Sequence, residues 1–600
     1  MGALSYDVDL EDIRFVLFDQ LKVHEELAPI EQYAEFDRET YEATLDEAAR
    51  IAREVLAPIN APGDREGCRL DADGNVHTPE GYGEAWRIMA EGGWIGVGSD
   101  PELGGIGMPG VITMAVVEMF IGACMAFEMY PGLTAAAARV VAAHGPEATR
   151  RAIATKMFSG EWAGTMCLTE AGAGSDVGEN RCRATPVGDR YHLEGEKIFI
   201  SGGDQDLTEN IVHLVLARTP DSPAGTKGLS LFLVPKVRFD DELALTARNG
   251  AYVTKIEEKL GIHGSATCVL TLGTQEPCEG WLVGEEHRGI QIMFEMMNEA
   301  RIGVGAQGVA VAATATRYAI AYARERVQGG SVRDLKDASA PRIAIQQHPD
   351  VRRMLMTMKV WTETMRSMLY RLGQRADVAE RDADEDKRRR YLERVELLVP
   401  ILKAHCSDLG FDASVMGLQV LGGYGYIGEY PLEQLVRDAK ICSIYEGTNG
   451  IQAMDLLGRK LRRRGGALFM DWMTDGQAEC AAAREEGFDQ AASALERSLQ
   501  HCGAAAMHLG GMGAQGQLEG TLLQAYPFLS MMGVVHLGLE ALSQARVAKR
   551  LIEEQGETPH RKGKLLNLSF YVANLLPQAS ALSRAVQSGD TSCLDEVLFT

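Results

Sequence analysis

The stretch RCRATPVGDRYHLEGEKIFISG (181–202) decides the fold class, together with IVHLVLAR (211–218) and LSLFLVPK (229–236). These segments are short and rich in β-branched or aromatic residues, and turn residues such as Gly188-Asp189 separate them. Such a pattern predicts strands joined by hairpins and not alternating strand–helix units. We therefore expect an antiparallel β domain over 162–282, built as a barrel or sandwich.

Helical patterns lie on both sides of this domain. The segment 39–57 carries apolar residues at three-to-four spacing with charges between them. The apolar region 111–143 contains Glu118 and Glu128, which favour a buried helix pair over a membrane span. Residues 1–161 are therefore predicted to form an N-terminal helical domain, with 1–38 as an extension.

Helical periodicity returns at residue 283. An Ala-rich region that ends near residue 327 predicts a long, closely packed helix pair, and we assign 283–465 to a helical bundle. The charge-rich run 375–390 is interpreted as a solvated connection between helices. The basic segment RKLRRRGG (459–466) is interpreted as a helix end and domain boundary, with phosphate binding as the alternative. Residues 466–600 form an extra C-terminal helical domain, so the fold class is α+β multidomain.

Composition excludes several classes of protein. The 600 residues include 84 acidic and 60 basic side chains, a formal charge of −24, which disfavours nucleic acid and anionic membranes as partners. Eleven cysteines without a CxxC pair, and the lack of an HExxH motif, predict no metal site and a reducing compartment. The first fifteen residues lack the pattern of a secretory or transit signal. We expect a cytoplasmic protein.

Two glycine motifs resemble a dinucleotide fingerprint. GxGxxG occurs at 105–110 and at 423–428. A Rossmann fingerprint follows a strand and opens a helix, whereas these motifs follow a loop and a helix. We interpret both as turns.

Three other segments carry candidate chemistry. In CLTEAGAGSD (167–176), glycines and hydroxyl side chains are typical of an anion cradle, or simply of a flexible loop. Phe199 and Ser201 lie two apart and share one face of a strand, which suits a flat ring with a polar edge, or an ordinary strand end. Glu446 lies between apolar residues and a Gly-Thr-Asn-Gly turn. A carboxylate desolvated there would act as a general base, or else cap a helix.

Together these segments resemble the acyl-CoA dehydrogenase family. The matching motifs, in sequence order, are CLTEAGAGSD (167–176), KIFISGG (197–203), AYARERVQGG (321–330), QVLGGYGYIGEYPLEQLVRDAK (419–440) and IYEGTNGIQ (444–452). The resemblance covers about residues 40–460. The length and the extra helices resemble a large bacterial subfamily that includes methylthiopropanoyl-CoA and long-chain acyl-CoA dehydrogenases.

The resemblance implies FAD as cofactor. The residues that it assigns to FAD are Met166, Leu168, Thr169, Ser175, Phe199, Ser201, Arg326, Gln419, Gly422, Gly423, Thr448 and Gly450. Ser201 stands where the family often has threonine. After Arg326 this chain reads VQGG, where the family often has RxxFG.

The resemblance also implies the reaction, an α,β-dehydrogenation of an acyl-CoA by way of α-proton abstraction. Glu446 is the implied base, and Glu299 is the alternative, on a helix where some relatives carry the base. Ser175, Asn298, Arg301 and Gly447 are implied to contact a fatty acyl-CoA or 3-(methylthio)propanoyl-CoA. Implied partners are an electron-transfer flavoprotein and a second copy of the chain. An acyl-CoA oxidase and a non-enzymatic DNA-associated relative are the alternative functions.

Overall fold

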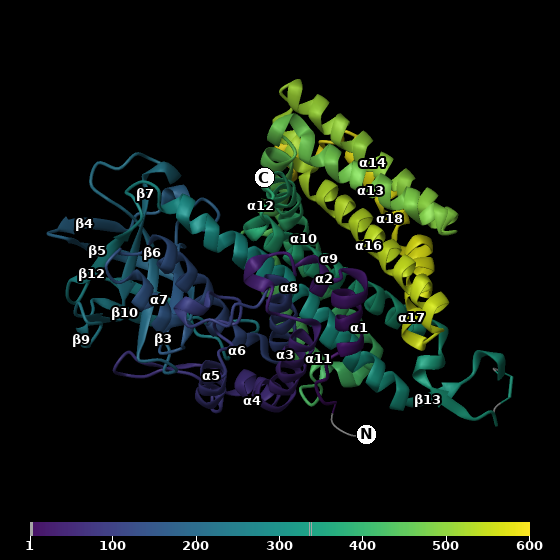
Figure 1. The fold of residues 1–600 in the computed structure, drawn as a ribbon, viewed down its shortest axis with the longest axis horizontal. Helices are drawn as coiled ribbons and strands as arrows, with labels where there is room; N and C mark the ends of the chain where they lie inside the picture. Colours follow the sequence, from purple (N-terminus) through teal and green to yellow (C-terminus); the bar gives the residue numbers. More distant parts are fainter. Residues whose placement is uncertain (1–3, 335, 338, 600) are drawn as a thin grey trace. The chain divides into compact units, whose positions relative to one another are not determined.

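The computed structural model describes residues 4–334, 336–337 and 339–599. The chain forms two compact units (Figure 1). The first comprises Met1–Asp46, Gly110–Glu118 and Val304–Thr600, and the second Glu47–Pro109 and Met119–Gly303.

The second unit is organised around an eight-stranded sheet in the order β10-β11-β5-β12-β7-β6-β3, with β4 paired to β5 and β6. Its strands are β3 Trp162–Cys167, β4 Arg183–Val187, β5 Arg190–Ser201, β6 Asn210–Arg218, β7 Leu229–Pro235, β10 Ala251–Ile256, β11 Thr267–Leu272 and β12 Cys278–Val283. The predicted antiparallel pairing is confirmed for most neighbours. β3, however, pairs with β6 in parallel, because the chain passes through the glycine-rich loop, β4 and β5 before β6.

Alternating side chains of the central strands supply two separate apolar cores. Leu214 and Leu216 of β6 join one cluster. It includes residues of the helices α6 (Gly110–His144) and α7 (Arg150–Phe158) and of the start of α8 (Gly289–Glu325). Val215 and Ala217 join the other cluster, which lies among residues of β5, β10 and β11. Because both faces are covered, β6 reads as a nearly continuous apolar run.

The second unit also contains several helices. They are α4 Ala57–Glu66, α5 Tyr82–Glu91, α7 Arg150–Phe158 and most of α6 Gly110–His144. The buried helix pair predicted for 111–143 is α6, which is interrupted at Cys124 (φ −155°, ψ 87°). Burial raises the pKa of Glu128 in this helix to about 8, so its carboxyl group is mostly protonated at neutral pH.

The first unit is helical apart from a two-stranded sheet of β13 Val327–Gly330 and β14 Arg342–Ala344. Its longer helices are α9 Pro349–Arg381, α10 Glu385–Leu421, α11 Leu432–Ala439, α12 Asn449–Asp455, α13 Ala467–Glu485, α14 Asp489–Ala514, α16 Ala525–Gln555, α17 Pro559–Phe570 and α18 Pro577–Gln587. The helices from α13 onward form the C-terminal block, in which α16 also packs against α9, α10 and α12 (Figure 1).

The Ala-rich region after residue 283 forms one helix and not the expected pair. α8 runs from Gly289 to Glu325 without interruption, because the segment contains no proline. Its small residues do permit close helix packing, as predicted. A Cβ atom at Gly308 would lie 2.3 Å from the Cys406 carbonyl oxygen of α10, so only glycine fits there.

The charge-rich run 375–390 is only partly a solvated connection. Residues 375–381 belong to α9, and α10 begins at Glu385. Asp377 is buried and accepts hydrogen bonds from the backbone N–H groups of Gly110 (2.6 Å) and Val111 (3.0 Å) at the start of α6. Burial raises the pKa of Asp377 to about 7. The prediction failed here because these partners lie far away in sequence.

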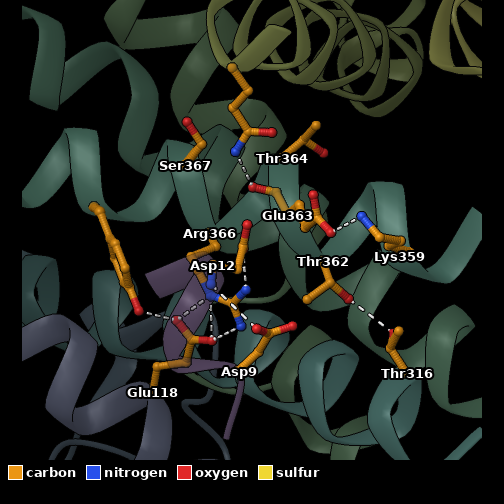
Figure 2. A network of polar contacts seen from close by, with 12 residues as sticks. Asp9, Asp12, Glu118, Thr316, Lys359, Thr362, Glu363, Thr364, Arg366 and Ser367 are labelled. Atoms are coloured by element: carbon orange, nitrogen blue, oxygen red, sulfur yellow. Dashed lines mark hydrogen bonds and ion pairs between the residues drawn. The ribbon is translucent and has the colours of Figure 1, made fainter. Parts of the chain in front are cut away.

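A buried charge network connects the beginning, the middle and the end of the first unit. Figure 2 shows the part of it that contains Asp12, Glu118 and Arg366. The guanidinium of Arg366 donates to Glu118 (2.6 Å) of α6 and to Asp12 of α1 Leu10–Arg14. Lys564 of α17 pairs with the same Asp12 and with Glu363 (2.6 Å) of α9. All five side chains are buried. The C-terminal block therefore shares a charged core with the rest of the unit.

Two helices are long and apolar enough to cross a membrane by length and composition. They are Gly110–His144 and Leu518–Gln555, whose apolar windows are 78% and 72% buried in the fold. Such burial is typical of core helices in water-soluble proteins. Across the described residues, no cluster of three or more His, Cys, Asp or Glu side chains is arranged to hold a metal ion.

We expect Lys564→Met to destabilise the protein by about 3–5 kcal/mol, because it leaves Asp12 and Glu363 buried without their shared cation. The midpoint of urea unfolding, followed by circular dichroism, measures the loss. The matched control is Lys562→Met, in the same helix, where the side chain is 56% exposed and pairs with Glu557. That change should move stability by no more than about 0.5 kcal/mol. Equal shifts in the two variants would contradict a structural role for the network.

Candidate active site

The glycine-rich loop after β3 is fixed by hydrogen bonds from the buried side chain of Lys197. The Lys197 ammonium donates to the Leu168 carbonyl oxygen (3.0 Å) and to the Glu170 carboxylate (2.8 Å). Burial raises the pKa of Glu170. The Lys197 charge and two backbone N–H donors outweigh that effect, and the net pKa lies below its usual value. The first half of the loop is therefore fixed.

The second half of the loop is open. A Cβ atom added at Gly172 or Gly174 would meet no protein atom within 4 Å, and Ser175 is exposed. Packing within the chain therefore does not explain these glycines. A bare backbone beside exposed hydroxyl groups fits an approaching anion, such as the pyrophosphate of a nucleotide.

Phe199 has a strained backbone and an exposed ring. Its φ is +58°, where a bulky residue is rare, and its side chain is 60% exposed. The strain arises at an irregularity in the pairing of β5 with β11, which lies between Cys268 and Leu270. Such strain costs of order 1–3 kcal/mol and is concentrated at functional sites. An exposed aromatic ring held in this way fits contact with a planar ligand.

The other residues predicted around Phe199 come from the same strands. Thr169 lies beside this segment of β5, because its carbonyl oxygen accepts the Ile198 backbone N–H (2.9 Å). Ser201 ends β5 and is partly exposed, while Met166 and Leu168 lie at the end of β3 and just beyond it. The prediction that Phe199 and Ser201 share one face of a strand assumed that side chains alternate strictly between the two faces of β5. The bulge interrupts this alternation. From 199 to 201 the burial pattern still alternates.

Of the predicted substrate residues of the second unit, Ser175 lies in the loop after β3, and Asn298 and Arg301 lie on α8. Arg301 is buried and donates to Asn298 (3.4 Å). The alternative base, Glu299, forms an ion pair with Arg139 of α6.

Glu446 lies in the first unit, on a tight turn between α11 and α12. Both Glu446 and Gly447 have left-handed backbones, with φ of +57° and +84°. The Gly447 carbonyl oxygen accepts from the Lys403 ammonium (2.8 Å) and from Gln452 (3.4 Å), and Gln452 also donates to the Glu446 carbonyl oxygen (3.3 Å). The strained turn is thus fixed by side chains of α10 and α12.

Thr448 and Gly450 begin α12. The Thr448 hydroxyl accepts the Ile451 backbone N–H (3.2 Å) as a helix N-cap. Its predicted pyrophosphate contact would use the hydroxyl proton, because phosphate oxygens accept hydrogen bonds and the N-cap bond engages only a lone pair of the hydroxyl oxygen.

The residues predicted for the adenine end come together in the first unit. The Arg326 guanidinium lies 5.3 Å from the ring centroid of Tyr424, in the turn that follows α10. Gly422 and Gly423 precede this tyrosine, and a Cβ atom at either would meet nothing within 4 Å. Gln419 is exposed in the last turn of α10. Tyr424 thus supplies an aromatic ring beside Arg326, in a chain that lacks the RxxFG phenylalanine.

Sequence reasoning missed two residues that hold these segments in place. Lys197 and Lys403 are both fully buried and donate to carbonyl groups of the candidate site. The available signal for Lys403 was a lone charge in the apolar run LVPILKA (398–404). A lysine in such a position is buried only when it has partners.

The geometry fits a bound flavin nucleotide. Within the second unit, the bare glycines at 172 and 174, the Ser175 hydroxyl and the exposed Phe199 ring suit a ligand with an anionic part and a planar part. Phe199, Ser201, Asn298 and Arg301 belong to the second unit, and Arg326, Gln419 and Glu446 to the first.

Comparisons with known proteins match the chain to the acyl-CoA dehydrogenase family along nearly its whole length. Family models of acyl-CoA dehydrogenase match the N-terminal domain at 38–161, the middle domain at 165–274 and the C-terminal domain at 287–461. A fourth model, acetyl-CoA dehydrogenase C-terminal like, matches 472–596.

Full-length relatives and solved structures agree with these matches. The chain is 36% identical to 3-methylmercaptopropionyl-CoA dehydrogenase of Ruegeria pomeroyi, over 98% of this chain and 99% of that protein. It is also 36% identical to the broad-specificity linear acyl-CoA dehydrogenase FadE5 of Mycobacterium tuberculosis, over 99% and 100%. The fold matches Caenorhabditis elegans ACDH-11 in complex with C11-CoA, with a TM-score of 0.77, 19% identity and coverage of 98% and 97%. A Bacillus anthracis acyl-CoA dehydrogenase complexed with FAD gives a TM-score of 0.73, 20% identity and coverage of 93% and 90%. The chain therefore belongs to the acyl-CoA dehydrogenase family, whose members are FAD-dependent oxidoreductases.

Proposed function

We propose that the protein dehydrogenates the α,β bond of a fatty acyl-CoA or of 3-(methylthio)propanoyl-CoA, with Glu446 as the base. The observation that carries this proposal is the Glu446 turn, a carboxylate on a strained backbone whose carbonyl groups are fixed by Lys403 and Gln452. Glu299 of α8, whose carboxylate pairs with Arg139, is the alternative base.

The chain's own task is to move one proton and to hold the thioester. The α C–H bond is weakly acidic, so the carboxylate of Glu446 must lie within hydrogen-bond reach of that proton in the bound complex. Charge then develops on the thioester oxygen, and one well-placed N–H donor is worth about 3–4 kcal/mol at that stage. By family resemblance, the backbone N–H of Glu446 is that donor. FAD, when bound, accepts the β-hydrogen with its electron pair.

The acyl group and the electron acceptor are the finer parts of the proposal. Support for the acyl group comes from the relatives named for 3-methylmercaptopropionyl-CoA and for linear acyl-CoA substrates. We propose an electron-transfer flavoprotein as acceptor. A panel of acyl-CoAs with a dye acceptor, including 3-(methylthio)propanoyl-CoA, tests the substrate. Peroxide formation under air would instead indicate an oxidase.

We further propose a cytoplasmic homodimer. Eleven free cysteines, ten of them at least partly buried, are consistent with a reducing compartment. A shorter relative, the short-chain specific acyl-CoA dehydrogenase of Clostridium acetobutylicum, matches only 63% of this chain. By family resemblance, the extra helices would replace one half of the tetramer contact of shorter members, which favours a dimer. Light scattering of the FAD-loaded protein tests the mass, and a tetramer would contradict this part.

We expect Glu446→Gln to retain FAD and acyl-CoA binding but to slow flavin bleaching by at least about 10²–10⁴-fold, the contribution of a placed general base. Glutamine keeps the shape of glutamate but does not accept a proton. Anaerobic stopped-flow absorbance after mixing with acyl-CoA measures the rate. Glu299→Gln is the matched control and should cost much less. Fast bleaching in Glu446→Gln, with none in Glu299→Gln, would move the base to α8.

We expect Gly174→Val to lower FAD affinity by about 10-fold or more, since it fills the open side of the loop with a branched side chain. The fold should tolerate the change, because a Cβ atom there meets no protein atom and the backbone is not left-handed. Flavin absorbance per chain after dialysis is the measurement. The control is Gly510→Val, an exposed position in α14 that also has open space. Normal FAD content in Gly174→Val would remove this loop from the cofactor site.

A further inference from the structure

A continuous set of hydrogen bonds runs from the Glu446 turn to the C-terminal block. Its first member is Lys403 of α10, which is fully buried. Its ammonium donates to the Gly447 carbonyl oxygen (2.8 Å) and to the side-chain oxygen of Asn449 (2.9 Å). The turn and the first residue of α12 are therefore held by one cation.

Asn449 passes the connection onward in one fixed orientation. Its oxygen accepts from Lys403, so its amide nitrogen faces the other way. That nitrogen donates to the Asp408 carboxylate (2.8 Å) and to the Ala404 carbonyl oxygen (3.1 Å). A flip of the amide group would lose these bonds at once and would turn donors toward an ammonium.

Asp408 ends the connection at α16. Its second carboxylate oxygen accepts the hydroxyl proton of Tyr526, in the first turn of α16. Burial raises the pKa of Asp408, and the hydrogen bonds from Tyr526 and Asn449 oppose that rise. The Tyr526 hydroxyl is thus the contribution of the C-terminal block to a set of bonds that reaches the residue next to Glu446.

The packing of α16 fixes where Tyr526 can lie. Gly533, two turns further along α16, faces His405 of α10. A Cβ atom at Gly533 would lie 2.5 Å from the imidazole ring. The two helices therefore approach as closely as a glycine allows. Such contact leaves α16 little freedom to shift relative to α10.

We propose that Tyr526, Asp408, Asn449 and Lys403 form a positioning relay, through which the C-terminal block holds the Glu446 turn in its reactive geometry. This inference rests on the proposed function of Glu446. The two left-handed residues, Glu446 and Gly447, relax unless their surroundings hold them. These four residues are positioning residues, since none of them is assigned to the substrate. The C-terminal block is thereby a working part of the active site.

The test separates proton abstraction from the rest of catalysis. In 3,3-dimethylbutanoyl-CoA the β-carbon carries no hydrogen, so no hydride can leave. With FAD-loaded enzyme in D₂O, the α C–H bond breaks and its electron pair remains as the enolate, while the proton passes to Glu446. Solvent deuterium then replaces it on the carboxyl group and returns to carbon. Mass spectrometry of the thioester counts these exchanges.

We expect Tyr526→Phe to slow α-proton exchange and anaerobic flavin bleaching by butanoyl-CoA about 3–10-fold each, as a slightly misplaced base would. The Michaelis constant should stay unchanged, because substrate contacts are untouched. The matched control is Tyr571→Phe, which removes another hydroxyl bound to α16, at the Val534 carbonyl oxygen (2.6 Å). It should lower the melting temperature without slowing exchange.

The outcomes distinguish the relay from the proposed function. If Glu446→Gln abolishes exchange but Tyr526→Phe exchanges and bleaches at the wild-type rate, the relay is wrong and the base assignment stands. If both tyrosine variants slow exchange equally, general loosening of α16 is responsible and the relay is again wrong. If Glu446→Gln exchanges and bleaches like the wild type, the proposed function itself fails. Asp408→Asn should also slow α-proton exchange and flavin bleaching. The double variant Tyr526→Phe/Asp408→Asn should be no slower than Asp408→Asn alone, because both changes break the same relay.

Discussion

The guanidinium of Arg366 is the charge around which the helical unit is assembled. It is 2% exposed and lies between Asp12 of the N-terminal extension and Glu118 of α6, while Lys564 of the C-terminal block shares Asp12. Burial raises the pKa of Asp12, but the neighbouring cations outweigh it and hold the pKa well below its usual value. The stabilisation is therefore complete above the unfolded-state pKa of an aspartate and is lost only as pH falls through the lower folded value. The N-terminal extension, α6 and the C-terminal block are therefore held together by the same buried cluster of opposite charges.

The same structural feature, a left-handed residue near a buried lysine, occurs at two places among the candidate site residues. Two of the proposed site residues, Phe199 and Glu446, adopt left-handed backbones that their side chains disfavour. Beside each of them a fully buried lysine donates to a loop carbonyl group, Lys197 to Leu168 and Lys403 to Gly447. A buried ammonium forms strong bonds to carbonyl oxygens because water does not compete there. The strain is thereby maintained by groups that never need to meet the substrate.

Local pattern was sufficient for the strands and most helices. The apolar runs at 211–218 and 229–236 became β6 and β7 almost to the residue, because strands covered on both faces have a plain signature. The local pattern did not predict which distant segments contact each other. The parallel contact between β3 and β6, and the burial of Asp377 against the start of α6, depend on partners that no window of sequence contains.

The site was predicted through motifs, and its supports were missed for the same physical reason. The glycines at 172 and 174 and Glu446 were found as parts of several motifs that together resemble a family, since each segment alone also fits a flexible loop or a helix cap. A lysine looks like a surface residue until its tertiary partners are known, so Lys197 and Lys403 were not singled out.

The exposed ring of Phe199 has a consequence for the life of the protein in the cell. A chain that folds before its flavin arrives presents this ring to water, next to a loop with no side chains at Gly172 and Gly174. Apolar surface of this kind favours self-association. The yield of soluble protein should then follow the supply of riboflavin during synthesis, so vitamin availability would act on the abundance of the enzyme before it acts on its turnover.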